Sequence, residues 1–180
     1  MAIVLDGSNG ITTNSGTVIS ASTIGVGGAT PSASGAGITF PATQSASTDA
    51  NTLDDYEEGT WTPTVTTGTV NTQTCNYIKI GRQATIWGRL FGFSNRSASS
   101  DVTINNLPFT SGSNSGAGAQ GNSLAQFISN MNGLTPFIGN SGTSLIFYDV
   151  RSGAFRSLIH SDLNSASTEI YFFAIYQTAN

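Results

Sequence analysis

The chain has 180 residues, of which 9% are charged and 38% are hydrophobic, and its formal net charge is −4. Charged residues usually make up about 25% of a soluble domain, and here glycine and small polar residues of the kind found in turn-rich β structure replace them. The charges are unevenly placed, because residues 1–60 hold six acids and no base, whereas residues 61–180 hold six bases and four acids. Neither part has the clustered basic residues that nucleic-acid binding needs, so nucleic acid is excluded as an expected partner.

Simple counts exclude several further kinds of protein. Cys75 is the only cysteine, so neither an intrachain disulfide nor a cysteine-based metal cluster is expected, and Cys75 should be a small apolar residue on a strand. No apolar run approaches the roughly 20 residues of a membrane-spanning helix, so no membrane partner is expected. The opening residues 1–10 lack the basic and apolar regions of a signal peptide, which predicts a protein that is cytoplasmic at synthesis.

Residues 1–52 are predicted to form an extended arm rather than a domain. Short β-prone pieces at 17–19, 23–24 and 37–40 alternate with segments rich in glycine and serine. Such a segment buries too little apolar surface to offset an ordering entropy of about 1–2 kcal/mol per residue, so we expect it to order only against other chains. The predicted assembly contacts of the arm are Ile3, Leu5, Ile11, Val18, Ile24 and Phe40.

Residues 53–59, LDDYEEG, are predicted to be an acidic hinge between the arm and a folded head. The four carboxylates suit a hard cation in kind, but Ca²⁺ needs 6–8 oxygens in a fixed geometry and the loop spacing of such a site is not present. The hinge is therefore interpreted either as a solvated linker or as a contact with basic residues of a neighbouring copy.

Residues 60–180 are predicted to be an all-β head, an antiparallel β-sandwich or jelly roll. Runs of β-branched and aromatic residues separated by turn signals indicate about eight or nine strands. Residues 123–130 have apolar side chains at helical spacing but suit a strand equally well. The strands are expected at 61–70, 75–80, 83–93, 101–105, 134–138, 144–150, 155–160 and 168–178.

Two of these strands carry large side chains on both faces. In residues 83–93, Ile86 and Leu90 alternate with Trp87 and aromatic neighbours, and residues 168–178 are aromatic or β-branched throughout. Both faces are therefore expected to be covered, one of them by other copies in a trimer. The predicted trimer or core face consists of Trp87, Phe91, Phe93, Tyr171 and Phe173.

The sequence predicts no enzyme and no catalytic, cofactor-binding or metal-binding residue. His160 is the only histidine and Asp162 follows it closely, but no motif supplies a nucleophile or an oxyanion donor beside them. The head's acids are scattered, which gives no carboxylate pair for glycoside hydrolysis. The glycine-rich segments do not join a strand to a helix, so they are not phosphate-binding loops.

Three polar loops are the candidate receptor contacts. Residues 94–100, 110–122 and 161–168 offer amide and hydroxyl groups of the kind that bind sugars, although polar loops also cover most β domains. The loop at 110–122 is long for a compact domain, which indicates a function or a partner. The residues predicted to reach a receptor are Asn95, Arg96, Asn114 and Asn164.

Several stretches of the chain resemble tail-fibre-type proteins of aquatic tailed bacteriophages. MAIVLDGSNGITT resembles the start of these proteins, and GITFPATQSASTDANTLDDYEEGTWTPTV resembles the junction before their terminal β domain. NYIKIGRQATIWGRL, followed by INNLPFTS, is similar to the first half of that domain, so the resemblance covers residues 1–13 and about 37–112. It implies a virion structural protein, a homotrimer without a catalytic motif, whose terminal domain binds the host surface. A host-surface glycan is the expected target of this domain.

The chain departs from this family in its length, because no shaft or adaptor domain is recognised. The departure leaves open an alternative, a capsid decoration (cement) protein whose arm runs across neighbouring capsid subunits. Both interpretations place the protein in the virion after synthesis in the host cytoplasm. Its expected partners are further copies of itself and, through the arm, other virion proteins.

Overall fold

The computed structural model describes residues 23–44, 46–49, 51–113, 119–130, 132–151 and 153–179. The chain forms two compact units, Met1–Thr43 and Gln44–Asn180. The boundary between these units precedes residue 52, where the sequence predicted the arm to end. In the first unit, β1 (Thr23–Gly25) pairs in parallel with β2 (Gly37–Thr39), which confirms two of the predicted β pieces.

The second unit is all-β, as the sequence predicted. No α-helix occurs within the described ranges, and none of their helices is long and apolar enough to cross a membrane. The ambiguous residues 123–130 begin as strand, because β8 continues to Gln126. The elements are β3 (Tyr56–Trp61), β4 (Thr64–Val65), β5 (Asn71–Ile80), β6 (Gln83–Phe91), β7 (Thr103–Asn105), β8 (Ala119–Gln126), β9 (Thr135–Ile138), β10 (Leu145–Arg151), β11 (Ala154–Ser157), the 3₁₀ helix η1 (His160–Asp162) and β12 (Glu169–Gln177).

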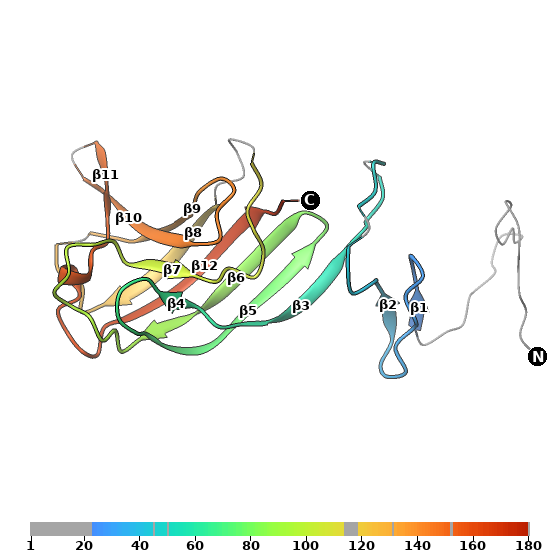
Figure 1. Ribbon diagram of the computed structural model, residues 1–180, viewed down its shortest axis with the longest axis horizontal. Coiled ribbons are helices and arrows are strands. Elements are labelled where there is room, and N and C mark those ends of the chain that lie inside the picture. Colours follow the sequence, from blue (N-terminus) through green and yellow to red (C-terminus); the bar gives the residue numbers. More distant parts are fainter. Residues whose placement is uncertain are drawn as a thin grey trace, which may run out of the picture. The chain divides into compact units, whose positions relative to one another are not determined.

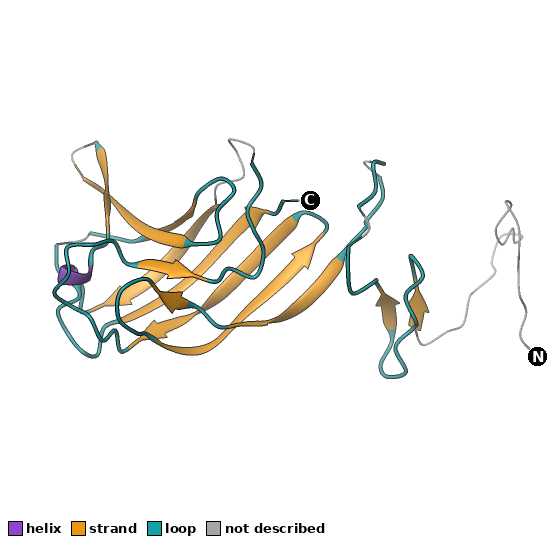
Figure 2. Cartoon of the chain, viewed as in Figure 1, coloured by secondary structure: helices purple, strands orange, loops and turns teal. Residues whose placement is uncertain are grey.

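These strands pair antiparallel in the order β3-β5-β6-β12-β8-β9-β10-β7-β4, and β11 pairs with β10. Figure 1 shows β3, β5, β6 and β12 side by side, with β4, β7 and β10 in a second layer, and Figure 2 shows that loops join nearly all of them. Gly81, with φ +54°, supplies the left-handed residue of the tight β5–β6 turn. The arrangement is a β-sandwich-like antiparallel fold.

The core lies between the two layers. Burial alternates along β12, so that Phe172 and its alternate neighbours point inward. The Phe172 ring packs edge-on against the rings of Trp61 and of Phe147 in β10, with distances between ring centroids of 6.3 Å and 6.2 Å. These contacts join the two layers. Cys75 is fully buried, as expected, and burial raises the pKa of its thiol to about 11. A Cβ at Gly88 would lie 2.3 Å from this sulfur, so glycine makes room for it.

Two predicted strands differ from the observed ones. The strand expected at 61–70 is interrupted, because β3 ends at Trp61 and β4 covers only Thr64–Val65. Pro63 lies between them and has no N–H for a ladder hydrogen bond. The strand expected at 155–160 ends at Ser157, and the chain continues into η1.

The acidic stretch 53–59 is not a solvated hinge, which corrects the first interpretation of it. Its residues belong to the second unit, and β3 begins within it at Tyr56. Asp55 is only 4% exposed and forms an ion pair with the equally buried Lys79 of β5. The Lys79 ammonium also donates to Gln44 Oε1 at 3.0 Å and lies 5.5 Å from the ring centroid of Phe109. The stretch is therefore fastened to the head by a buried charge pair.

Candidate functional site

The most distinctive surface is one side of the layer formed by β3, β5, β6, β12 and β8, here called the outer sheet face. Phe173 lies opposite Trp87 on β6 and Asn122 on β8, and Tyr171 lies opposite Leu124. Residues paired across an antiparallel ladder point to the same side, so these side chains share one face. Seven large apolar side chains on this face are between 37% and 73% exposed: Tyr56, Ile80, Trp87, Leu124, Tyr171, Phe173 and Ile175.

The outer sheet face contains two shallow hollows. One, of about 390 Å³, is lined by residues of β3, β5 and β6 that include Thr60, Asn76 and Trp87. The other, of about 400 Å³, is lined by residues of β8 and β12 that include Leu124 and Tyr171. Trp87 lines the first hollow, and Tyr171 lines the second. Shallow hollows beside exposed aromatic rings suit the insertion of side chains from a partner protein.

The charges on this face largely neutralise one another. Arg89 forms an ion pair with Glu169, and the two side chains are 21% and 19% exposed. The Arg89 guanidinium lies 4.5 Å from the ring centroid of Phe91 and 5.5 Å from that of Tyr171, which holds it flat against the sheet. The hydrogen bond from Arg89 lowers the pKa of Glu169 and raises that of Arg89.

Acid should lower the folding stability of the head, because it protonates Glu169 and breaks the ion pair with Arg89. Because the pKa of Glu169 is lower in the folded state than in the unfolded chain, its stabilisation is full above the ordinary glutamate pKa. That stabilisation is lost as the pH falls below this value and through the lowered folded pKa. Urea midpoints measured between neutral pH and about pH 3 should therefore fall less steeply in Glu169→Gln than in the wild type. Parallel pH profiles for the two proteins would contradict this role of the ion pair.

The predicted trimer or core face is divided by the structure. Trp87, Tyr171 and Phe173 are exposed on the outer sheet face, and Phe91 is half-buried on the same face beneath Arg89. Phe93 is fully buried in the core and does not share the outer sheet face with the other four. The cause is Gly92, whose φ of +63° ends the alternation of β6 and turns the next side chain inward.

His160 and Asp162 lie near each other, but their side chains bind different partners. His160 is fully buried, and its Nδ1 donates to the carbonyl oxygen of Asn95 at 3.0 Å. The Asp162 carboxylate accepts from Arg156 at 2.7 Å and from the Ile159 N–H at 3.2 Å. Both side chains thus fasten loops at one end of the sandwich. In the part of the chain that the structure describes, no three His, Cys, Asp or Glu side chains gather to hold a metal ion.

The structure brings two predicted receptor loops together. The Ser161 N–H donates to the carbonyl oxygen of Ala98 at 2.9 Å, so loops 94–100 and 161–168 meet at the end of the sandwich that carries η1 (Figure 1). Arg96 and Asn164 are exposed there. Both are therefore surface residues, and neither lines either of the two hollows of the outer sheet face.

Two of the predicted receptor residues have other roles or cannot be placed. The Asn95 side-chain oxygen accepts from the N–H groups of Ser97 and Ala98, both at 3.1 Å, so it stabilises its own loop. Asn114 lies outside the described residues.

The predicted arm contacts can be examined only in part. Ile3, Leu5, Ile11 and Val18 lie outside the described residues. Phe40 is half-buried, whereas Ile24 is 43% exposed and its β2 neighbour Ile38 is 58% exposed. The β1–β2 pair therefore leaves two apolar side chains uncovered.

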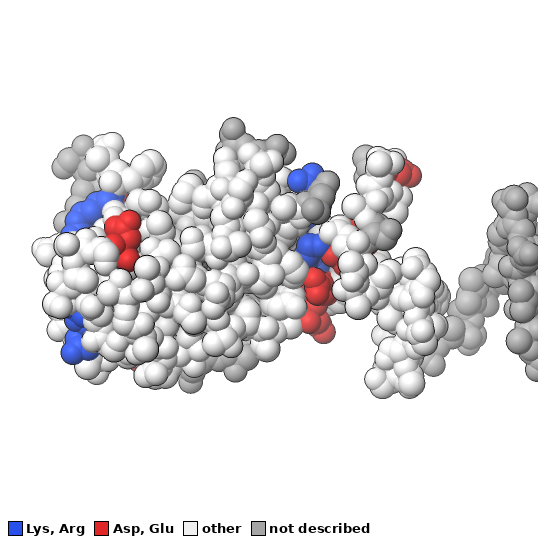
Figure 3. Space-filling view, viewed as in Figure 1, with Lys and Arg blue, Asp and Glu red and all other residues white. Residues whose placement is uncertain are grey.

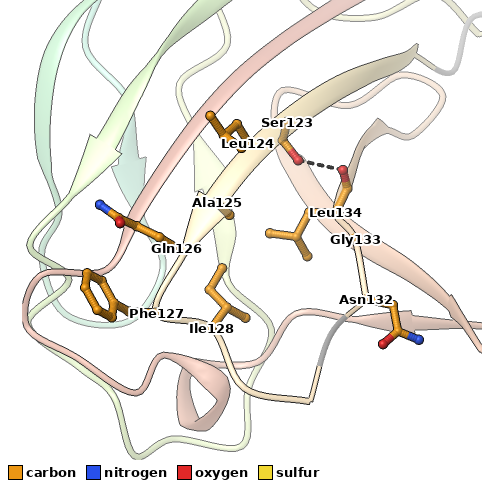
Figure 4. A pocket seen from close by; sticks show the side chains of 9 residues that line it. All are labelled: Ser123, Leu124, Ala125, Gln126, Phe127, Ile128, Asn132, Gly133 and Leu134. Atoms are coloured by element: carbon orange, nitrogen blue, oxygen red, sulfur yellow. Dashed lines mark hydrogen bonds between the residues drawn. The ribbon is translucent and has the colours of Figure 1, made fainter.

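A cavity beside β8 was not indicated by the sequence. β8 pairs with β9 at Ala119 and Gln120, the Ser123 hydroxyl donates to the Leu134 carbonyl oxygen at 2.5 Å, and an opening lies beside this contact. Phe127, directly after β8, has φ 58°, which turns the chain away from the sheet. The Phe127 carbonyl oxygen accepts from the Asn164 N–H at 3.1 Å and from the Thr168 hydroxyl at 3.0 Å, and these bonds hold the turn. The opening is a cavity of about 260 Å³ (Figure 4).

The face of the molecule seen in Figure 3 is poor in charge. In the view of Figure 3, Lys, Arg, Asp and Glu form small separate groups on an otherwise uncharged surface.

Comparisons of the chain with protein-family models, curated proteins and solved structures find no match. The functional evidence is therefore the sequence resemblance together with the outer sheet face and the cavity.

Proposed function

We propose that the protein is a non-enzymatic virion structural protein of the tail-fibre type, a homotrimer whose head contacts a host-surface glycan. The observation that carries the proposal is the outer sheet face, where seven large apolar side chains are exposed in one chain. Soluble monomers rarely expose a contiguous apolar patch of this kind, and such patches mark interfaces. The resemblance of residues 1–13 and about 37–112 to tail-fibre-type proteins supports the same conclusion.

In the proposed trimer, the outer sheet faces of three copies pack against one another. Trp87 and Phe173 lie opposite each other on neighbouring central strands, so they are the expected centre of the contact. The exposed Ile24 and Ile38 of the first unit are expected to bind other virion proteins. The predicted jelly-roll topology and the location in the virion stay predictions.

A capsid decoration protein is the second candidate. The observation in its favour is the first unit, a separate compact body whose β1–β2 pair leaves Ile24 and Ile38 exposed. A body of this kind suits contact with neighbouring capsid subunits as well as it suits attachment to a tail. The two candidates differ in copy number rather than in chemistry.

Densitometry of purified phage particles that contain this chain should distinguish the two candidates. A tail-fibre protein is expected in a few trimers per virion, whereas a decoration protein is expected at a level comparable with that of the major capsid protein. Absence of the chain from purified particles would overturn both. The receptor role predicts that the purified full-length chain binds host cells and that added host polysaccharide prevents this binding. Full binding at saturating polysaccharide would overturn the glycan assignment.

A further inference from the structure

Strands β9, β10 and β11 carry three aromatic rings side by side, here called the aromatic row. Phe137 of β9 lies 5.8 Å from Tyr148 of β10, and Tyr148 lies 6.1 Å from Phe155 of β11, measured between ring centroids. Phe137 is 41% exposed, Tyr148 is half-buried and Phe155 is 80% exposed. Figure 1 shows that β11 and the adjoining end of β10 project from the rest of the sandwich, in keeping with the high exposure of Phe155.

Strand register explains why the three rings share one face. Phe137 is paired with Ile146, two residues before Tyr148, and Tyr148 is paired with Ser157, two residues after Phe155. Paired residues and alternate residues of antiparallel strands point to the same side. Residues 147 and 149, which alternate with them on β10, are buried, so the aromatic row lies on the side away from the core.

The polar groups beside the aromatic row are hydroxyl groups and a carboxylate. Thr135 lies opposite the middle ring on β9 and is exposed. Ser157 lies opposite the same ring on β11, and its hydroxyl donates to the half-buried Asp101 carboxylate at 2.6 Å. The basic Arg156 alternates with Ser157 and therefore points to the other side of β11. A carboxylate accepts hydrogen bonds from hydroxyl groups and repels anions, so this surface favours a neutral, hydroxyl-rich ligand.

The size of the aromatic row suits a small ligand better than a protein. A whole aromatic side chain has about 150–250 Å² of surface, so the three rings together expose roughly 300 Å². A stable protein–protein interface needs about 800 Å² from each partner. Neighbouring rings of the row also stand at 77° and 64° to each other, so their faces do not form one flat patch.

We propose that the aromatic row binds uncharged pyranose residues of the host-surface glycan, an assignment that rests on the proposed receptor function. A pyranose ring has C–H groups on its faces and hydroxyl groups on its rim. The partly positive C–H hydrogens stack on the negative face of an aromatic ring, above all on Phe155, which is the most exposed of the three. The hydroxyl groups of the sugar then bind the Thr135 hydroxyl and the Asp101 carboxylate in place of water.

Saturation-transfer NMR and titration calorimetry with the full-length chain test this assignment. The probes are the neutral oligosaccharides cellohexaose, maltohexaose and mannohexaose, and the anionic comparison is a galacturonic acid oligomer of the same length. We expect transfer to the C–H protons of at least one neutral oligosaccharide and weaker binding of the galacturonate. Absence of binding by all three neutral oligosaccharides would overturn the proposal, and so would an equal or higher affinity for the galacturonate.

Removing the most exposed ring localises the binding. Because Phe155 is 80% exposed, Phe155→Ala should leave the fold intact. We expect it to weaken oligosaccharide binding by about two- to tenfold, whereas Phe155→Tyr, which keeps the ring, should bind like the wild type. Leu124→Ala is the matched control, because Leu124 is 73% exposed and lies on the outer sheet face instead. Equal affinities of Phe155→Ala and the wild type would overturn the site.

Failure of this site and failure of the proposed function have different signatures. If no neutral oligosaccharide binds but the chain still adsorbs to host cells in a polysaccharide-sensitive way, the aromatic row is not the sugar site and the receptor function stands. If Phe155→Ala loses oligosaccharide binding but adsorbs normally, the row binds sugars and its assignment to host recognition is overturned. If Phe155→Ala lowers the mass of the assembly in light scattering, the row is a contact between copies and the proposal is wrong.

Discussion

Replacing Lys79 with methionine is expected to destabilise the second unit by about 3–5 kcal/mol, the usual cost of removing one partner from a buried ion pair. Asp55 and Lys79 have side chains that are only 5% and 4% exposed, so the variant leaves a carboxylate in the interior without its countercharge. The substitution also removes the hydrogen bond to Gln44 that links residues before β3 to β5. The check is urea denaturation of the full-length protein followed by tryptophan fluorescence.

Two controls separate the charge pair from general damage. Replacing both partners, as Asp55→Leu with Lys79→Met, should recover most of the lost stability, because an apolar pair of similar volume carries no desolvation cost. Glu58→Gln removes an exposed carboxylate in the same acidic stretch and should change stability by less than about 0.5 kcal/mol. A Lys79→Met protein as stable as Glu58→Gln would show that the pair does not fasten this stretch to the head.

The burial of Asp55 could not be predicted from the sequence of the acidic stretch. Four acids in five residues resemble a solvated linker, and nothing local distinguishes Asp55 from its neighbours. Its partner lies 24 residues later on another strand, and the ladder that brings them near each other pairs Glu57 with Lys79. Burial of a charge is thus decided by strand register, which the local sequence does not contain.

The strands themselves were predictable because their period is local. Alternation along residues 168–178 and 83–93 indicated two-sided strands, and β12 and β6 fall at these positions. Phe93 was grouped with Trp87, but it lies beyond the end of β6, follows the left-handed Gly92 and points into the core. A glycine within an alternating run permits such a reversal, but only the backbone conformation shows that it occurs.

The cavity could not be predicted for a different reason. It lies at the end of β8, where Phe127 adopts a left-handed conformation that a bulky residue seldom takes. The hydrogen bonds that hold Phe127 come from Asn164 and Thr168, far along the chain. The letters of 123–130 alone suited a helix as well as a strand, so they contained no sign of an opening.

Phe173→Lys is expected to convert the proposed trimer into monomers, with a dissociation constant raised by about 30-fold or more, since central aromatic contacts commonly contribute about 2 kcal/mol or more. The substitution places one charge per subunit in an apolar contact, where no acid lies directly opposite it on β6 or β8. The isolated subunit should remain folded, because Phe173 is 42% exposed in the single chain. Light scattering should change from three times 18.6 kDa to one chain.

Phe155→Lys is the matched control, because Phe155 of β11 is 80% exposed and lies off the outer sheet face. It should leave the mass in light scattering unchanged at concentrations where Phe173→Lys is monomeric. A monomeric wild-type protein would contradict the trimer, and dissociation by Phe155→Lys but not by Phe173→Lys would move the interface to another surface. Phe173 lies opposite Trp87, so Trp87→Lys should raise the dissociation constant of the trimer as Phe173→Lys does. If the two rings form one contact, combining the substitutions should add little to either alone, whereas additive effects would indicate two separate contacts.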